Sequence, residues 1–285
     1  MKAYIFPGQG SQFVGMGKDL FHSSHLAKKK FKLSDDILGF KITKIMFEGP
    51  QEILKNTLYT QLAIYIYSVI KTKILNNFNP DMVAGHSLGE FSALASIGVF
   101  SFEEGLILVN KRAYMMQKIC QSISGGMAVI LGLEDHIIEE VCKKDKGIIV
   151  PANYNSPGQL VISGEKKALQ RVCLSLKKKG AKKILILPVN GAFHSPIMST
   201  VQKKLEKIIQ KISFKNSKCP IYQNVNAQPV TKYHEIKKNL IEQLTSPVKW
   251  KQSIKNMIDD GAITFNEIGP GNILQGLMKK IYKNA

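Results

Sequence analysis

The chain has 285 residues, 44% of them hydrophobic, which excludes whole-chain disorder and allows one or two domains with a buried core. No apolar run is long enough to span a bilayer, and the start of the chain lacks the apolar core and cleavage site of a signal peptide. The four cysteines are far apart and form no C-x-x-C, which argues against a zinc or redox motif. We therefore expect a cytoplasmic protein without metal or membrane contact, or one from an organelle matrix if a targeting segment was removed.

The formal net charge is +19, and only two of the 40 basic residues are arginine. Two compatible explanations are a compositional bias toward lysine and an acidic partner attracted over long range. The lysine runs at 28–30 and 177–179 have no interleaved aromatic residues and belong to no recognisable nucleic-acid-binding module. We therefore expect no nucleic-acid partner.

In the first part of the chain, short apolar strands run into glycine-rich loops. The predicted elements are a strand at 3–6 with a loop at 7–10, a helix at 51–76, a strand at 81–84, and helices at 90–96 and 102–120. The strand at 81–84 leads directly into Gly85-His86-Ser87-Leu88-Gly89.

The middle of the chain predicts a β-α-β-β-α-β order, which is the ferredoxin-like pattern. Its elements are a strand at 127–131, a helix at 134–144, strands at 148–152 and 160–163, a helix at 165–179 and a strand at 183–189. A helix at 198–212, strands at 220–225 and 263–268 and a helix ending at Tyr282 follow. We expect a larger α/β subdomain from residues 1–123 and 196–285 and a smaller one from 124–195, with a ligand cleft between them.

Gly85-x-Ser87-x-Gly89 between a strand and a helix is typical of a nucleophile elbow. The glycines leave the backbone room for a sharp turn. The turn exposes the Ser87 hydroxyl and places the Leu88 amide where an oxyanion would form, at the start of a helix. The alternative is an ordinary strand–turn–helix junction.

A serine nucleophile needs a base, and His194 is the best placed of the six histidines. It follows a strand at the return from the smaller subdomain, where it can face the cleft. Of the others, His22 and His25 are expected on the surface, His136 in a charged helix and His234 in a loop. His86 is expected to support the turn. A loop histidine with only a local hydrogen bond is the open alternative for His194.

Two further features could take part in a binding or reaction site. The loop Gly8-Gln9-Gly10 is neither a P-loop nor a G-x-G-x-x-G, and its close-lying backbone can supply a second oxyanion donor. Arg112, on the helix after the elbow, can hold a carboxylate through two parallel hydrogen bonds, unless it is only a surface or structural arginine.

In chain order, these motifs resemble the malonyl-CoA:acyl carrier protein transacylase family, and also the acyltransferase domains of fatty acid and polyketide synthases. The resemblance covers nearly the whole chain. Its motifs are FPGQGSQ at 6–12, GHSLGE at 85–90, KR at 111–112, GMA at 126–128, ANYNSPGQ at 152–159, GAFHS at 191–195, PVKW at 247–250 and EIGPG at 267–271.

The resemblance implies an α/β-hydrolase-like core with an inserted ferredoxin-like subdomain. It implies Ser87 as nucleophile, with His194 as base held by a backbone carbonyl near residues 247–249. Gln9 and the Leu88 amide would form the oxyanion hole. The remaining implied substrate contacts are Arg112 on the malonyl carboxylate, Phe193 beside the base as in malonyl-selective members, and Asn153 and Asn155 near the cleft. Leu62 and Ser246 depart from common family residues, and neither is expected to carry chemistry. Lys249 stands where other members often carry glutamine or arginine, and a backbone contact would tolerate that change.

The expected function is therefore that of an acyltransferase, a malonyl-CoA:acyl carrier protein S-malonyltransferase. It would move a malonyl group from coenzyme A to the phosphopantetheine thiol of acyl carrier protein through a malonyl-serine ester. No cofactor is expected, because the coenzyme A thioester is a substrate, and the chain is expected to be a monomer. The absence of fused synthase domains favours fatty acid over polyketide biosynthesis. The alternatives are a serine hydrolase or thioesterase and an inactive module that binds a carrier protein.

Overall fold

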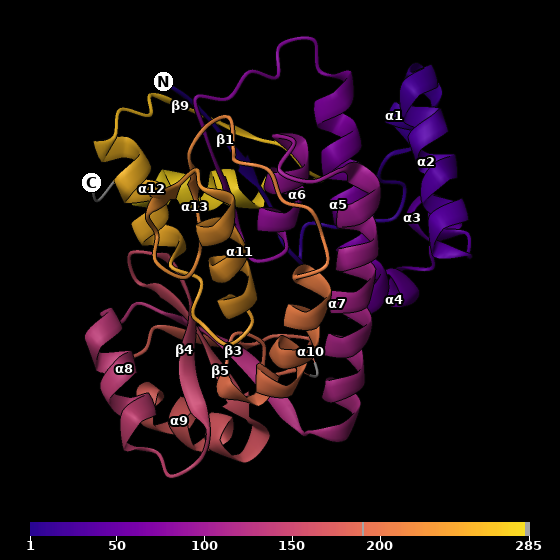
Figure 1. The fold of residues 1–285 in the computed structure, drawn as a ribbon. Coiled ribbons are helices and arrows are strands. Elements are labelled where there is room, and N and C mark those ends of the chain that lie inside the picture. Colours follow the sequence, from indigo (N-terminus) through magenta and orange to yellow (C-terminus); the bar gives the residue numbers. More distant parts are fainter. Residues whose placement is uncertain (190, 283–285) are drawn as a thin grey trace.

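The computed structural model describes residues 1–189 and 191–282, and within them the strands form two separate sheets surrounded by helices (Figure 1). The predicted subdomain limits also include residue 190 and residues 283–285, which lie outside the described residues. None of the described helices is long and apolar enough to cross a membrane. The chain is a mixed α/β protein, as the sequence predicted.

The larger sheet has five strands in the order β8-β7-β2-β1-β9. The four strands β1 (Lys2–Phe6), β2 (Met82–Gly85), β7 (Ile221–Tyr222) and β9 (Thr264–Glu267) run parallel, and β8 (Pro229–Val230) pairs antiparallel at one edge. Because parallel strands end at the same edge of a sheet, the loops after β1, β2 and β7 meet there. This edge positions the candidate site.

Alternate residues of β1 serve two hydrophobic cores, as the period of two in a strand requires. Tyr4 and Phe6 pack into one core with α5 (Thr57–Ile74) and α7 (Phe102–Ser122). Ala3 and Ile5 pack into a second core on the opposite face. A sheet covered on both faces explains why these strands read as short continuous apolar runs.

Helices flank the larger sheet on both sides (Figure 1). The further helices are α1 (Lys18–Ser23), α2 (His25–Leu38), α3 (Ile42–Glu48), α4 (Gln51–Leu54), α6 (Gly89–Ser96), α10 (Ser199–Ile209), α11 (Tyr233–Glu242), α12 (Trp250–Asp259) and α13 (Ile273–Tyr282). Residues of α12 and α13 belong to the second core, and those of α6, α10 and α11 belong to the first.

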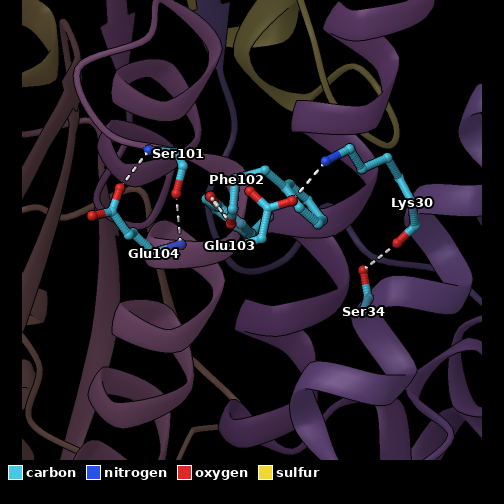
Figure 2. A network of polar contacts seen from close by, with 7 residues as sticks. Lys30, Ser34, Ser101, Phe102, Glu103 and Glu104 are labelled. Carbon is cyan, nitrogen blue, oxygen red and sulfur yellow. Dashed lines mark hydrogen bonds and ion pairs between the residues drawn. The ribbon is translucent and has the colours of Figure 1, made fainter.

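Local hydrogen bonds and one ion pair hold the start of α7, the helix that carries Arg112. The Ser101 side chain accepts from the Glu104 amide and the Glu104 carboxylate accepts from the Ser101 amide, which is a capping box. Glu103 forms an ion pair of 2.7 Å with Lys30 on α2 (Figure 2). Together these contacts fix where α7 begins and tie it to α2.

The smaller sheet has four antiparallel strands in the order β4-β5-β3-β6 and lies at the bottom left of Figure 1. Its elements are β3 (Gly125–Leu131), α8 (Asp135–Lys144), β4 (Ile149–Ser156), β5 (Gln159–Glu165), α9 (Lys166–Lys178) and β6 (Lys183–Ile186). The predicted β-α-β-β-α-β order is confirmed. The helices α8 and α9 pack on this sheet around a third core.

Main-chain hydrogen bonds join the smaller sheet to the rest of the molecule. The Tyr154 amide of β4 donates to the Val248 carbonyl at 2.9 Å, and the Val248 amide donates to the Ala152 carbonyl at 2.8 Å. This bridge sets β4 beside the segment that precedes α12.

Several predicted boundaries were wrong. The helix expected at 51–76 is two helices, because Asn56 caps a new helix by accepting from the Leu58 amide. The helix expected at 198–212 begins as a 3₁₀ turn, Pro196–Met198, and α10 then ends at Ile209. The strands expected at 183–189 and 220–225 are shorter, and β4 extends to Ser156 because its pairing with β5 continues to Gln159.

Some elements were not predicted from the sequence at all. These are α1, α2, α3, α11, α12 and β8. His234, expected in a loop, lies in α11. The helices α1 and α3 are short and bury none and two of their residues, so they leave little periodic signal. The longer helices α2, α11 and α12 each bury four residues, so their apolar pattern was present in the sequence and was not recognised.

Candidate active site

Ser87 occupies a sharp turn between β2 and α6. Its backbone is left-handed, with φ 53°, and the turn is closed by a hydrogen bond of 3.0 Å from the Gly89 amide to the His86 carbonyl. A Cβ on Gly85 would lie 2.0 Å from the Gly89 carbonyl carbon, and one on Gly89 would lie 2.0 Å from the Phe6 carbonyl oxygen. The two glycines are therefore required by close backbone approach, as the elbow motif predicts.

Asn224, in the loop after β7, holds this turn from the neighbouring strand. Its Oδ1 accepts from the Ser87 amide at 2.7 Å, and its Nδ2 donates to the Gly85 carbonyl at 2.6 Å. Because Asn224 is fully buried, these bonds satisfy two backbone groups that water does not reach. No sequence motif pointed to Asn224, since its position depends on the pairing of β7 with β2.

His194 lies against the serine although 107 residues separate them. Its Nε2 is 2.8 Å from Ser87 Oγ, and its Nδ1 is 2.9 Å from the Gln243 carbonyl and 3.2 Å from the Ser246 carbonyl. Two carbonyl acceptors place the ring proton on Nδ1, which leaves the Nε2 lone pair for the serine hydroxyl. The resemblance placed the anchoring carbonyl within residues 247–249, but the two carbonyls observed belong to Gln243 and Ser246, just before that segment. The backbone of Ser246 therefore takes part in the site.

The environment of His194 favours the neutral imidazole. Burial, assisted by the positive charge of Arg112, lowers the pKa of His194 to about 3, although the hydrogen bonds to Gln243 and Ser246 oppose this shift. A neutral imidazole at ordinary pH can accept the proton of Ser87.

Arg112 is fully buried and is not a surface arginine. Its Nη2 donates to Ser87 Oγ and to Gln243 Oε1, each at 3.2 Å, and its Nη1 donates to Gln61 Oε1. Burial lowers its pKa to about 10, so the guanidinium stays protonated near neutral pH. A permanent positive charge therefore touches the serine hydroxyl.

Glu90 and Gln243 complete a buried network behind the serine. Gln243 Nε2 donates to the Ser87 carbonyl at 2.9 Å and to Glu90 Oε2 at 2.6 Å, while Glu90 Oε1 accepts from the Asn224 amide. Sequence reasoning gave neither residue a role. Glu90 stands in the GHSLGE motif and could have been noticed, whereas Gln243 has no local signal.

A cavity of about 460 Å³ opens beside the serine, between the loop after β1 and the smaller sheet. Among the predicted site residues, those that line it are Gln9, Ser87, Asn153, Asn155, Phe193 and His194. Leu88 and Arg112 are not part of its lining, and Arg112 reaches the site through Ser87.

The two predicted oxyanion donors differ in position, because only Gln9 lines the cavity. Gln9 lines the cavity and its Nε2 donates a long hydrogen bond of 3.4 Å to Thr57 Oγ1. Nothing in the described part of the chain accepts a hydrogen bond from the Leu88 amide. Both donors are thus free or nearly free for a new acceptor.

Asn153 and Asn155 lie on β4 and not in a loop. Asn153 Oδ1 is buried and, within the described residues, has no hydrogen-bond partner. Asn155 Oδ1 lies 2.9 Å from His86 Nε2, which joins the elbow to the smaller sheet, and the predicted support of the turn by His86 runs through this contact. Phe193 is buried next to the histidine.

The remaining predicted positions lie away from the cavity. His22, His25, His136 and His234 are exposed, and Arg171 forms an exposed ion pair with Asp145. Across residues 1–189 and 191–282, no group of three or more histidine, cysteine, aspartate or glutamate side chains is placed to hold a metal ion.

Comparison with known proteins gives a consistent result. Residues 3–285 match the family model described as an acyl transferase domain. The chain is 40% identical to the malonyl CoA-acyl carrier protein transacylase of Bacillus subtilis (strain 168), across 98% of this chain and 90% of that protein. It is also 40% identical to the transacylase of Staphylococcus aureus (strain COL), across 99% of this chain and 93% of that protein.

Solved structures agree with the sequence relatives. The malonyl CoA-acyl carrier protein transacylase of Coxiella burnetii has a TM-score of 0.96 and 36% identity, covering 100% of this chain and 92% of that one. A malonyl-transacylase in complex with a type II polyketide acyl-carrier protein has a TM-score of 0.95 and 36% identity, covering 99% of this chain and 93% of that one.

Proposed function

The chain belongs to the acyl transferase domain family, and from this premise we propose that it transfers a malonyl group from coenzyme A to acyl carrier protein in fatty acid biosynthesis. The observation that carries the proposal is the contact of one serine hydroxyl with both a neutral histidine and a buried arginine. The serine–histidine pair supports covalent acyl transfer, and the arginine selects an acyl group that ends in a carboxylate.

The proposed architecture follows the family. Residues 1–123 and 196–285 would form an α/β-hydrolase-like subdomain, and residues 124–195 a ferredoxin-like one. The strand order β4-β5-β3-β6 and the sharp turn after β2 support these assignments. The monomeric state and the cytoplasmic location stay predictions.

In the first half-reaction, His194 Nε2 takes the proton of Ser87 and the serine oxygen attacks the thioester carbonyl of malonyl-CoA. The Leu88 amide and Gln9 hold the resulting oxyanion, and the loss of one such donor typically raises the barrier by about 3 kcal/mol. Arg112 pairs with the malonyl carboxylate. The coenzyme A thiolate leaves with the proton from His194, and a malonyl ester remains on Ser87.

In the second half-reaction, the phosphopantetheine thiol of the carrier gives its proton to His194 and attacks the ester. The oxyanion forms in the same place, and the serine oxygen leaves with the proton from His194. Coenzyme A thioester and carrier are both substrates, so no cofactor enters the scheme. Asn153, Asn155 and Phe193 are proposed to contact the substrate because they line the cavity.

Intact-protein mass spectrometry after brief mixing with malonyl-CoA tests the proposal. We expect a malonyl adduct on the wild type and none on Ser87→Ala, with the exposed Ser122→Ala variant as a matched control that keeps the adduct. Free malonate without an adduct would indicate a hydrolase. Unchanged malonyl-CoA without an adduct would indicate a binding module.

A further inference from the structure

Glu90 is a fully buried acid that the proposed reaction steps do not use. It is the third residue after Ser87 and lies on α6. Both of its carboxyl oxygens accept hydrogen bonds, one from the Asn224 amide and one from Gln243 Nε2. Since the carboxyl group only accepts in these contacts, their geometry suits the ionised form.

One amide group stands between this acid and the buried arginine. The Gln243 side chain donates from Nε2 to Glu90 and accepts through Oε1 from Arg112. The hydrogen-bond acceptors of Arg112 are all neutral oxygens, and within the described residues the arginine forms no ion pair. The negative charge that acts on Arg112 is that of Glu90, and the Gln243 side chain is hydrogen-bonded to both groups.

We propose that the ionised form of Glu90 balances the charge of Arg112 while the acyl site is empty, and that this form takes up a proton from solvent when a malonyl carboxylate pairs with Arg112. The inference rests on the proposed function. A second carboxylate at Arg112 adds a negative charge to a buried site, and like charges disfavour ionisation. One proton joins one carboxylate oxygen, and the buried site keeps its net charge.

Other titratable groups around the site do not replace Glu90. The helix α6 packs against α5, α7, β1 and β2, and only Arg112 on α7 exerts a charge on Glu90. His194 has a pKa of about 3, and burial also lowers the pKa of His86. The tyrosines Tyr4 on β1 and Tyr65 on α5 donate to backbone carbonyls.

Glu90 itself is poised to respond. Burial raises its pKa to about 8, while the bonds from Asn224 and Gln243 and the charge of Arg112 pull it down. A small additional negative charge therefore changes its protonation near the pH at which enzymes work.

The test follows proton uptake with an indicator dye in weakly buffered solution during acyl loading, with intact mass on the same samples. Loading with acetyl-CoA is the matched control, because it releases the same coenzyme A thiol and brings no carboxylate. We expect malonyl loading at pH 8 to take up more protons per acyl-enzyme than acetyl loading, by at most about half a proton, since a group of pKa about 8 is half ionised there. The excess should vanish in Glu90→Gln and persist in the partly exposed Glu103→Gln.

Two results would overturn the inference about Glu90. Equal uptake for malonyl and acetyl between pH 7 and 9 overturns the inference, and so does an excess that persists in Glu90→Gln. If Glu90→Gln does not fold, infrared difference spectra of the wild type decide, because malonyl loading must add a protonated carboxyl band that acetyl loading does not. Failure of the adduct itself would reject the proposed function, which is a distinguishable result.

Discussion

Arg112 Nη2 lies 3.2 Å from the hydroxyl oxygen of Ser87, so the buried cation touches the proposed nucleophile. A group bound to Ser87 that ends in a carboxylate can reach the guanidinium without leaving the ester. Under the proposed function, this contact would bring the selection of the acyl group and its covalent attachment to Ser87 together at one place.

Replacing Arg112 should therefore separate malonyl from acetyl transfer. We expect Arg112→Ala to lower kcat/KM for malonyl-CoA by on the order of 100-fold, about 3 kcal/mol, because a buried carboxylate loses its paired cation. Acetyl transfer should fall far less. Steady-state kinetics with both donors measure this, with Arg112→Lys as an intermediate case, and equal losses for both donors would remove the clamp.

The pH dependence of acylation should reflect the depressed pKa of His194. Because its pKa is about 3, the imidazole stays neutral as pH falls well below 6.5, the ordinary value for histidine. We expect single-turnover malonyl transfer to lose no activity to His194 protonation between pH 7 and 5. A half-maximal rate near pH 6.5 would show an unperturbed histidine.

The same shift has a consequence for stability. The folded state binds the His194 proton less readily than the unfolded chain, so the contribution of His194 to stability is present above pH 6.5 and is lost as pH falls toward 3. We expect the His194→Asn variant to lose less unfolding free energy than the wild type over that interval. Urea unfolding at pH 7, 6 and 5 measures the difference, and parallel curves would contradict it.

Asn224 should matter for both folding and catalysis. Asn224→Ala leaves the Ser87 amide and the Gly85 carbonyl without partners, and each buried loss costs about 1–3 kcal/mol. We expect a fall of about 2–4 kcal/mol in the free energy of unfolding and a lower kcat. Gln228→Ala, an exposed change in the same loop, is the control and should leave both values nearly unchanged.

The elbow glycine Gly85 should not accept a methyl group. In Gly85→Ala the new Cβ would lie 2.0 Å from backbone atoms of Gly89, so we expect a loss of at least about 3 kcal/mol of stability or no folded protein. Gly276→Ala is a contrasting case, because the exposed Gly276 lies within α13 and nothing stands within 4 Å of its added Cβ. Thermal unfolding should show a gain of about 0.5–1 kcal/mol there.

The net charge of +19 should affect the binding of the carrier protein and should not affect the reaction of its thiol. We expect the KM for an acidic carrier protein to rise several-fold between about 50 and 300 mM salt, because screening weakens long-range attraction. Free pantetheine, an uncharged acceptor thiol, is the control and should show no such rise. A carrier KM independent of salt would assign the lysines to composition alone.

The sequence by itself determined the features that depend on residues close together in the chain. The elbow at Ser87 could be predicted because its glycines and flanking apolar residues are consecutive, and the order of strands and helices in the middle segment follows local periodicity. His194 was reached by elimination among six histidines, and its contact with Ser87 was an expectation of the family resemblance.

Only the tertiary structure decided which distant groups meet. Asn224 reaches the elbow because β7 pairs with β2, and Gln243 reaches four groups of the site because α11 ends beside His194. The burial that lowers the pKa of His194 and raises that of Glu90 likewise comes from packing. A local pattern indicates turn and helix geometry. These contacts join residues 49 to 156 positions apart and depend on strand register and helix packing, which no local pattern indicates.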